Sequence, residues 1–380
     1  MEFQYNLPVN LIFGKGSIGK IGHIAMDYGK KALIVTGCSS TKKSGLLDRT
    51  VVYLEKAGIE SIVFDRVKQN PLTTTAIAAA DTAKDQNCDM VIGLGGGSIM
   101  DCAKAAAFLS VNSGDINDYI FGREKGNQAL PIILVPTTCG TGSEGNGFAV
   151  LTNPENGDKK SLRSNSIIAS ASIVDSECMM TMPKHILASV GFDALCHCME
   201  AYVSRIGQPM TDMISHRGIE LIGKYLIPLY EGECNPDAWD AVSLASTFGG
   251  MAINTAGVTL PHGMEHPVSG LHNVVHGKGL AAITPVVMDA TIQCCDKKSK
   301  EKYAEVSRCL GGTDETNCVR KINEMLERLR MKVTLTDLGV LEKDVDWMTD
   351  NCMKVSAAGI SYHPVTFCKS QIHELYEKAL

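Results

Sequence analysis

Short β-rich runs alternate with helical patterns over the first 180 residues, and this alternation constrains the fold more than any other feature of the sequence. Residues 31–36 (KALIVT), 61–65 (SIVFD), 90–95 (MVIGLG) and 132–135 (IILV) are typical of strands. Helical patterns lie between them, including an Ala-rich one at residues 101–109. Strands that alternate with helices of this length predict βαβ units and a mostly parallel sheet.

The pattern changes near residue 183, beyond which long stretches have helical periodicity and convincing strands disappear. The expected helices cover residues 186–203, 213–230, 238–256, 278–293, 302–310 and 318–329. The sequence therefore predicts an α/β domain at residues 1–180 followed by an all-helical domain at residues 181–380.

Charge and apolar patterning narrow the classes of function. The 42 Asp and Glu residues outnumber the 36 Lys and Arg residues, and the net charge of −6 argues against a nucleic-acid partner or an anionic membrane surface. The opening MEFQYNLPVN lacks the basic and apolar regions of a secretory signal, and no run of about 18 apolar residues indicates a membrane span. We expect a cytoplasmic protein.

Fourteen cysteines are scattered along the chain without a CxxC pair. In a long chain without a visible secretory signal, we expect reduced thiols that pack as small hydrophobic side chains, not a disulfide framework.

Three glycine- or hydroxyl-rich turns are candidate nucleotide sites. Residues 93–98 (GLGGGS) join the strand at 90–95 to a helix, where backbone N–H groups can hold a phosphate. The alternative is an ordinary strand–helix turn, since the run is neither GxGxxG nor a P-loop. Residues 136–144 (PTTCGTGSE) follow the next strand and form a candidate second wall of the same site. The formal GxGxxG at residues 14–19 lacks the strand and acidic residue of its motif, and we interpret it as a turn.

The helical half carries a constellation of histidines and one aspartate. Asp193 and His197 are four residues apart on a predicted helix and therefore share a face, as do His262 and His266. His276 follows ten residues later. Imidazoles and a carboxylate suit a divalent metal such as Zn(II) or Fe(II), although any one of these histidines alone is more often a satisfied core or surface residue.

Taken together, these segments resemble a known family. Residues 95–104 (GGGSIMDCAK), 136–144 (PTTCGTGSE), 191–204 (GFDALCHCMEAYVS) and 262–277 (HGMEHPVSGLHNVVHG) resemble the iron-containing, group III alcohol dehydrogenases. The sequence after His276 is similar to the butanol-dehydrogenase-like branch. The resemblance covers the chain from its beginning to about residue 290, and the last 90 or so residues contribute only general helical character.

The resemblance implies a dehydroquinate-synthase-like architecture, in which an N-terminal dinucleotide-binding domain precedes an all-α catalytic domain and the metal site lies between them. It carries the metal ligands onto Asp193, His197, His262 and His276, and it makes His266 a catalytic, non-ligand residue. The cofactor contacts that it implies are Gly95, Gly96, Gly97, Ser98, Asp101, Thr137, Thr138, Thr141, Asn70 and Lys160.

One position departs from the family pattern. Many NAD-using members have an aspartate directly after the strand that corresponds to residues 31–36, whereas this chain has Gly37, followed by Ser39 and Ser40 with Lys42 and Lys43 nearby. The missing carboxylate removes repulsion toward a 2′-phosphate, and hydroxyls and lysines could bind one. We therefore predict NADP(H) rather than NAD(H).

The implied reaction is reversible hydride transfer between NAD(P)H and a small aliphatic aldehyde or alcohol, at Fe(II) or alternatively Zn(II) or another divalent metal. The family also implies a homodimer. Three alternatives share the scaffold: a zinc-type glycerol or polyol dehydrogenase, a dehydroquinate-synthase-like lyase, and a metal- or nucleotide-binding sensor without turnover. The ligand-bearing segments are poor in Arg and Lys, which disfavours the lyase because its substrate is phosphorylated and carboxylated.

Overall fold

The computed structural model describes residues 2–233 and 235–380. Its contacts divide the chain into two compact units. We call Asn6–Asn156 with Lys160–Met182 the sheet unit, and Met1–Tyr5, Gly157–Lys159 and Pro183–Leu380 the helical unit. The division into domains at 1–180 and 181–380 stays a prediction.

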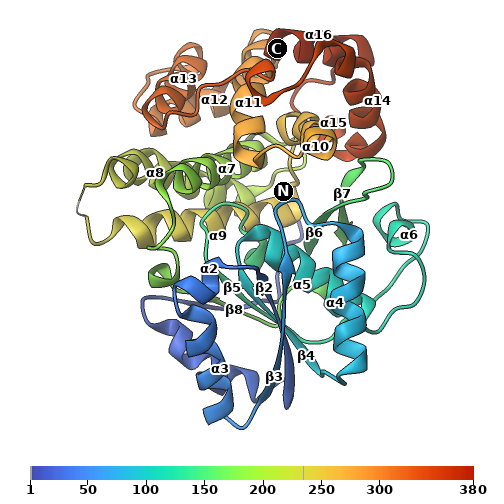
Figure 1. The fold of residues 1–380 in the computed structure, drawn as a ribbon. Coiled ribbons are helices and arrows are strands. Elements are labelled where there is room, and N and C mark those ends of the chain that lie inside the picture. The colour runs from blue at the N-terminus through green and yellow to red at the C-terminus, as the bar shows by residue number, and fades with distance from the viewer. Residues whose placement is uncertain (1, 234) are drawn as a thin grey trace. The chain divides into compact units, whose positions relative to one another are not determined.

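A six-stranded parallel sheet forms the centre of the sheet unit, with strand order β1-β8-β5-β4-β2-β3 (Figure 1). The parallel sheet confirms the fold class expected from the alternating pattern. Its strands are β1 (Asn10–Phe13), β2 (Lys31–Gly37), β3 (Glu60–Val67), β4 (Met90–Gly95), β5 (Ile132–Pro136) and β8 (Ala171–Val174). From β2 the chain continues to β3 on one side, and it then crosses to β4 and β5 on the other side, so the strand order reverses between β2 and β4. Open α/β sheets bind ligands at such a switch point, at the carboxyl ends of the strands.

Helices cover both faces of this sheet because successive strand side chains point to opposite sides. Ile34 and Ile92 pack with α1 (Ile21–Ala25) and α3 (Leu46–Lys56) in one buried cluster. Leu33 and Val91 pack with α4 (Thr73–Asp85) and α5 (Gly97–Leu109) in another. The remaining elements include α2 (Ser40–Lys43), α6 (Ile116–Ile120) and a separate two-stranded sheet of β6 (Phe148–Thr152) and β7 (Lys159–Arg163).

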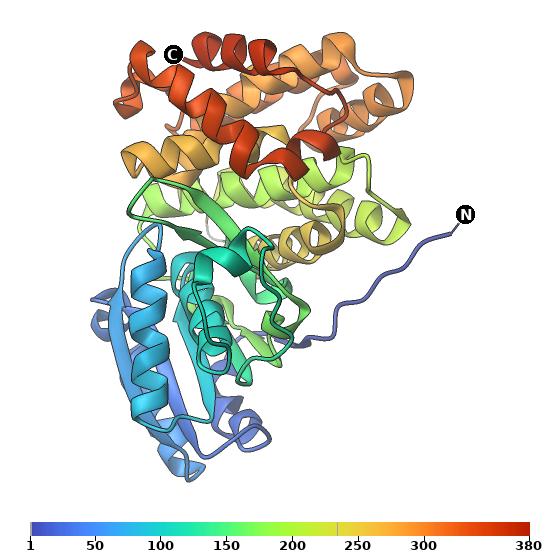
Figure 2. The same cartoon turned by 90° about the vertical axis from the view of Figure 1, so that its right-hand side faces the viewer.

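From Pro183 to Leu380, the described part of the helical unit contains helices and no strand, as Figure 2 shows. Its helices are α7 (Lys184–Val203), α8 (Pro209–Glu231), α9 (Ala238–Ala256), α10 (Leu260–His272), α11 (His276–Cys294), α12 (Lys297–Cys309), α13 (Cys318–Arg328), α14 (Val345–Val355), α15 (Ala357–Tyr362) and α16 (Lys369–Ala379). Helices α10, α14, α15 and α16 are not among those expected from sequence periodicity.

Helix α10 forms in spite of two prolines, for reasons that lie in its surroundings. Pro261 is in the first turn, where a missing N–H leaves no intrahelical bond unmade. Pro267 lacks the N–H that would bond the carbonyl of Gly263 four residues earlier. The hydroxyl of Ser356 donates to that carbonyl instead, at 3.0 Å.

Helix α7 lies in the core of the helical unit. By length and composition it could cross a membrane, with a mean hydropathy of 1.3, but 83% of its apolar window is buried inside the structure, as in the core helix of a globular protein. Neighbouring helices approach it closely at glycines: a Cβ on Gly218 of α8 would lie 2.4 Å from Cys198 Sγ, and one on Gly249 of α9 would lie 3.1 Å from His197 Cβ. The position of α7 is therefore fixed on two sides.

A buried lysine ties α5 to the segment after β5. Lys104 is fully buried, and its Nζ donates to Ser143 Oγ at 2.8 Å, to the Asn146 carbonyl at 2.8 Å and to the Phe148 carbonyl at 2.9 Å. Burial lowers the pKa of Lys104 to about 8, although the charges of Asp101 and Glu144 oppose this shift. The ammonium group therefore fixes the backbone conformation of residues 143–148.

Replacing this lysine with an apolar residue of similar length should destabilise the fold. In Lys104→Met, several buried oxygen atoms lose their donor, so we expect the free energy of unfolding to fall by about 3 kcal/mol. Urea denaturation measures this, with Lys84→Met on the exposed side of α4 as the control that should change stability by less than about 0.5 kcal/mol.

The pH dependence of that difference checks its cause. Because the pKa of Lys104 is lower in the folded than in the unfolded chain, the unfolded chain binds more protons between these two pKa values. The wild-type protein should therefore gain stability relative to Lys104→Met as the pH rises from 8 to 10. A difference that is constant with pH would contradict this account.

Candidate metal centre

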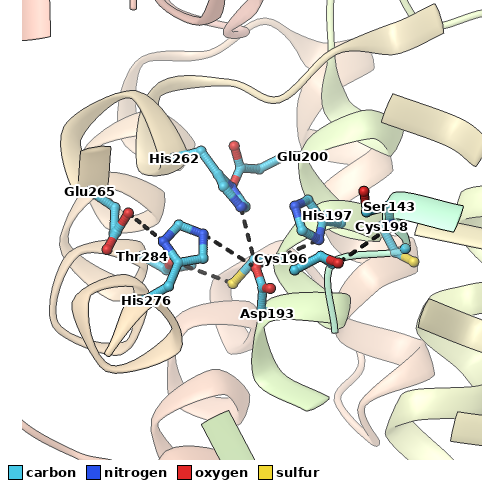
Figure 3. Close-up of polar contacts among 12 residues, drawn as sticks. Ser143, Asp193, Cys196, His197, Cys198, Glu200, His262, Glu265, His276 and Thr284 are labelled. Atoms are coloured by element: carbon cyan, nitrogen blue, oxygen red, sulfur yellow. Dashed lines mark hydrogen bonds and ion pairs between the residues drawn. The ribbon is translucent and has the colours of Figure 1, made fainter. Parts of the chain in front are cut away.

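Three polar side chains form one stripe on helix α7. Asp193 and His197 are four residues apart, and Glu200 follows three residues later, so all three project from one side of the helix. All are buried, at 3%, 6% and 4% exposure. Figure 3 shows them directed toward the side chains that α10 and α11 contribute.

Two further histidines come from helix N-termini. His262 lies in the first turn of α10, and His276 is the first residue of α11. The next residue, Gly277, lets α11 approach α7 closely, because a Cβ there would lie 2.2 Å from the carbonyl oxygen of Ser189. This contact brings His276 to the stripe on α7.

The histidines converge on a single carboxylate oxygen. Asp193 Oδ1 lies 3.4 Å from His262 Nε2, 3.5 Å from His197 Nδ1 and 3.6 Å from His276 Nε2 (Figure 3). Asp193, His262 and His276 have ligand atoms within 4.8 Å of one another. His197 stacks on His262 with ring centroids 4.5 Å apart.

Glu200 orients His262 from the far side of its ring. Glu200 Oε1 lies 2.5 Å from His262 Nδ1, and Oε2 accepts from the Thr259 N–H at 2.6 Å. Thr259 is the N-cap residue of α10, so this carboxylate also lies at the positive end of that helix. The position and the ring orientation of His262 are therefore set by the same group.

Glu265 does the same for His276. Its Oε2 forms a short contact with His276 Nδ1, and its Oε1 accepts from the hydroxyl of Ser269. Lys159 Nζ lies 3.5 Å from the same Glu265 oxygen and 3.5 Å from His276 Nδ1. Glu265 is completely buried, so its charge is balanced within this cluster.

Two buried atoms of this cluster that have no hydrogen-bond partner are placed as ligands of a divalent cation would be. Since His262 Nδ1 faces Glu200, the tautomer with Nδ1 protonated leaves a lone pair on Nε2. That Nε2 atom and Asp193 Oδ1 are both buried without a hydrogen-bond partner, although they lie 3.4 Å apart. Two facing acceptors repel each other unless a cation joins them. Ligands about 2.1 Å from a tetrahedral metal are about 3.4 Å apart, so the spacing fits as well.

The electrostatics of the metal-free cluster lead to the same conclusion. Burial disfavours the charged form of His262, yet Glu200 and Asp193 outweigh it and raise its pKa to about 10. Burial dominates at His197 and lowers its pKa to about 4. The pKa values of Asp193, Glu200 and Glu265 are lowered, because the neighbouring histidines outweigh the cost of burial. Without a metal, a proton on His262 takes the place of the cation.

His266 lies one turn after His262 on α10 and is half-buried. Its ring centroid is 6.4 Å from that of His262 and 6.1 Å from that of His276. It is therefore next to the cluster without belonging to the group of converging ligand atoms.

The sheet unit brings together most of the cofactor contacts expected from the sequence. Gly95 and Gly96 end β4 and cap α5, and Gly97 and Ser98 begin that helix. A Cβ on Gly96 would lie 3.0 Å from Thr138 Oγ1, and one on Gly97 would lie 2.3 Å from Thr141 Cγ2. The glycine turn therefore lies directly against the hydroxyl-rich turn after β5, which begins with Thr137.

The other expected residues lie at several points around these turns. Gly37 ends β2, and Ser39 and Ser40 begin α2. Asn70, in the segment between β3 and α4, has a φ of 48° and is buried. Asp101 accepts hydrogen bonds from Ser143 Oγ at 2.6 Å and the Val150 N–H at 3.0 Å, which gives it a role in holding this segment.

Lys160, expected at the cofactor, is on β7 with its Nζ 5.6 Å from the centroid of the Phe121 ring. Sequence reasoning did not find its neighbour Lys159, nor Glu200 and Glu265. A signal existed for Glu200, because it continues the helical stripe of Asp193 and His197. The contact between Lys159 and Glu265 joins residues 106 positions apart, and no local spacing reveals it.

Comparisons with known proteins agree with this geometry. The profile of the family described as "Iron-containing alcohol dehydrogenase" matches residues 8–176, and that of "Fe-containing alcohol dehydrogenase family, C-terminal" matches residues 187–380. The chain belongs to the iron-containing alcohol dehydrogenase family. It is an NAD(P)-dependent alcohol dehydrogenase, and the family implies a metal of the iron type and a nicotinamide cofactor.

Similar proteins span nearly the whole chain. "Alcohol dehydrogenase 4" of Saccharomyces cerevisiae is 31% identical over 99% of this chain and 98% of its own length. The "NADPH-dependent butanol dehydrogenase" of Clostridium saccharobutylicum is 29% identical over 98% of this chain and 97% of its own length. A crystal structure of the archaeal alcohol dehydrogenase ADH/D1 from a Red Sea brine pool has a TM-score of 0.96 at 32% identity, covering 100% of this chain and 99% of that one. Alcohols and aldehydes are therefore the substrate class of the family.

Removing the charge behind His276 should weaken metal binding. In Glu265→Gln the shape is kept, but the histidine loses the carboxylate that fixes its tautomer and the orientation of its ring. We expect metal affinity to fall by about 10- to 100-fold. Competition between the metal-free enzyme and a coloured chelator for Zn(II) measures this, with the exposed Glu342→Gln as control. Equal affinities of the two variants would show that Glu265 only fills space.

Proposed function

We propose that this alcohol dehydrogenase reversibly reduces small aliphatic aldehydes, that it uses NADP(H) rather than NAD(H), and that its metal is Fe(II). The observation that carries the proposal is the pair of facing, unpartnered acceptors, Asp193 Oδ1 and His262 Nε2, within a cluster of histidines. The alcohol dehydrogenase family supports a role for these two atoms in binding the catalytic metal. The names of relatives such as the butanol dehydrogenase support short alcohols as substrates.

The proposed ligands are Asp193, His197, His262 and His276. One carboxylate and three imidazoles accept Fe(II), Zn(II) and related ions, and the family name supports iron. When bound, the metal supplies Lewis acidity toward the substrate oxygen and the nicotinamide supplies or accepts the hydride. Glu200 and Glu265 keep the histidine nitrogens directed at this position.

His266 is the proposed proton donor and acceptor. Aldehyde reduction consumes one hydride and one proton, and the proton must reach the alcohol oxygen. An imidazole titrates near neutral pH and can transfer a proton in either direction. His266 is half-buried beside the ligand cluster, so it can exchange protons with solvent while its ring stays close to His262 and His276.

Activity measurements test the metal site directly. Enzyme loaded anaerobically with Fe(II) should reduce butanal with NADPH, and both Asp193→Ala and His276→Ala should lose at least about 1,000-fold in kcat/KM, since each leaves an incomplete ligand set. The exposed Asp350→Ala is the matched control and should keep full activity. Turnover of glycerol but not butanal would favour the polyol dehydrogenase. Absence of turnover with several aldehydes, alcohols and metals would contradict the proposal and favour a sensor.

The preference for NADP(H) rests on residues at the end of β2. Relatives include NADPH-dependent and NAD-dependent enzymes, so the argument comes from this chain. Gly37 offers no carboxylate to the adenosine ribose, and the hydroxyls of Ser39 and Ser40 follow it. Lys42 forms an ion pair with Asp65. The lysine that could attract a phosphate is therefore its exposed neighbour Lys43.

Restoring the missing carboxylate should reverse the cofactor preference. A Cβ on Gly37 would meet the Val67 carbonyl at 3.6 Å and Ile99 Cδ1 at 3.8 Å, which are ordinary contacts, so the substitution fits. In Gly37→Asp, repulsion of the 2′-phosphate should shift the ratio of kcat/KM for NADPH over NADH by at least about tenfold toward NADH. Gly37→Asn, nearly the same shape without the charge, is the control. A wild-type enzyme that already prefers NADH would contradict the proposed cofactor.

A further inference from the structure

A second group of metal-binding side chains lies in the helical unit, apart from the cluster around Asp193. Among residues 2–233 and 235–380, ligand atoms converge within 4.8 Å in two places, and the second consists of His216, Glu220 and Cys309. This group offers one nitrogen, one oxygen and one sulfur. No role in the alcohol dehydrogenase reaction falls to any of the three.

Helix geometry places these residues together. His216 and Glu220 are four residues apart on α8, and His216 Nδ1 lies 3.7 Å from Glu220 Oε1. Cys309 is the last residue of α12, and its Sγ lies 3.7 Å from His216 Nε2. A tetrahedral Zn(II) ion bonded to one sulfur and one imidazole nitrogen separates the two by about 3.6 Å. The spacing of Cys309 Sγ and His216 Nε2 therefore already suits such an ion, whereas Glu220 Oε1 faces the other nitrogen, Nδ1, of the same ring.

The backbone holds Cys309 against α8. A Cβ on Gly223 would lie 2.4 Å from the Cys309 carbonyl oxygen, so the two segments touch at a position where only glycine fits without rearrangement. Gly223 is one turn after Glu220. The sulfur is therefore presented to the His216–Glu220 face by a rigid contact.

Solvent reaches this group of side chains. Glu220 uses its Oε2 atom to accept from Arg217, at 2.9 Å, and its Oε1 atom faces His216. His216 and Glu220 are 34% and 40% exposed, so an ion can enter from solvent and keep a water ligand. Burial, Glu220 and Glu305 raise the pKa of the Cys309 thiol to about 11, and a bound cation opposes this effect.

We propose that Cys309 Sγ and His216 Nε2 bind a second metal ion, selective for Zn(II), that Glu220 accepts a hydrogen bond from His216 Nδ1 and so directs Nε2 at the ion, and that water completes the coordination. Thiolate and imidazole donors suit Zn(II), whereas the cluster around Asp193 contains only nitrogen and oxygen. On binding, a Zn–S bond replaces the S–H bond of Cys309 and the proton is released to solvent. The ion would join α8 to the end of α12, two segments that are far apart in sequence.

Cobalt(II) is the probe that separates the two sites. A thiolate bound to Co(II) gives an intense near-ultraviolet charge-transfer absorption, which a site of carboxylate and imidazoles cannot produce. Reduced, metal-free full-length enzyme titrated with Co(II) should develop this absorption, and added Zn(II) should abolish it. The absorption should disappear in Cys309→Ser and in His216→Ala. It should persist in Cys294→Ser, which removes an exposed thiol that does not belong to this group.

A second measurement makes the test independent of catalysis. The double variant Asp193→Ala, His276→Ala should lose butanal reduction but keep the charge-transfer absorption. Cys309→Ser should bind one Zn(II) per chain less than the wild-type enzyme, with an unchanged circular dichroism spectrum. A wild-type enzyme without the absorption, or a Cys309→Ser variant that retains it, would overturn the second site while leaving the proposed function intact.

Discussion

The charge of one buried carboxylate, Asp193, organises the core of the helical unit. It lies on α7, and the histidines that compensate it come from α7 itself and from the first turns of α10 and α11. Outside this inner set, Glu200 and Glu265 add negative charge behind His262 and His276. Such an arrangement is costly without a cation, because buried charges must be paired. Binding of the proposed ion would therefore be coupled to the packing of these three helices.

The helices and strands that could be predicted are those whose pattern lies within their own residues and does not depend on partners distant in sequence. Strands such as β2 and β4 are apolar and flanked by turns, and α9 has a clear helical period, so these were found. Helix α10 was not, because two prolines argue against it and the compensating hydroxyl of Ser356 comes from a residue 93 positions away. Strands β6 and β7 were missed as well, since they belong to a small sheet and carry no long apolar run.

The same distinction applies to the candidate site. The spacing of Asp193 and His197 on one helix suggests a shared face, and the structure places both beside His262 and His276. The partners that set the histidine tautomers could not be inferred in this way, because Glu265 and Lys159 meet only through tertiary packing. Lysines at consecutive positions also differ completely in environment: Lys159 is 5% exposed within the histidine cluster, whereas Lys160 lies beside Phe121.

The distribution of thiols has a consequence for chemical damage. Thirteen of the fourteen cysteines lie in the described part of the chain, all as free thiols, and Cys234 lies outside it. Burial raises the pKa of Cys196 and Cys198, beside the histidine cluster, so these sulfurs stay protonated and unreactive. Cys38, by contrast, is exposed directly after β2. An oxidant or alkylating agent would thus modify the exposed Cys38, Cys294 and Cys368 before the thiols beside the histidine cluster, and of these three only Cys38 directly follows a strand of the sheet.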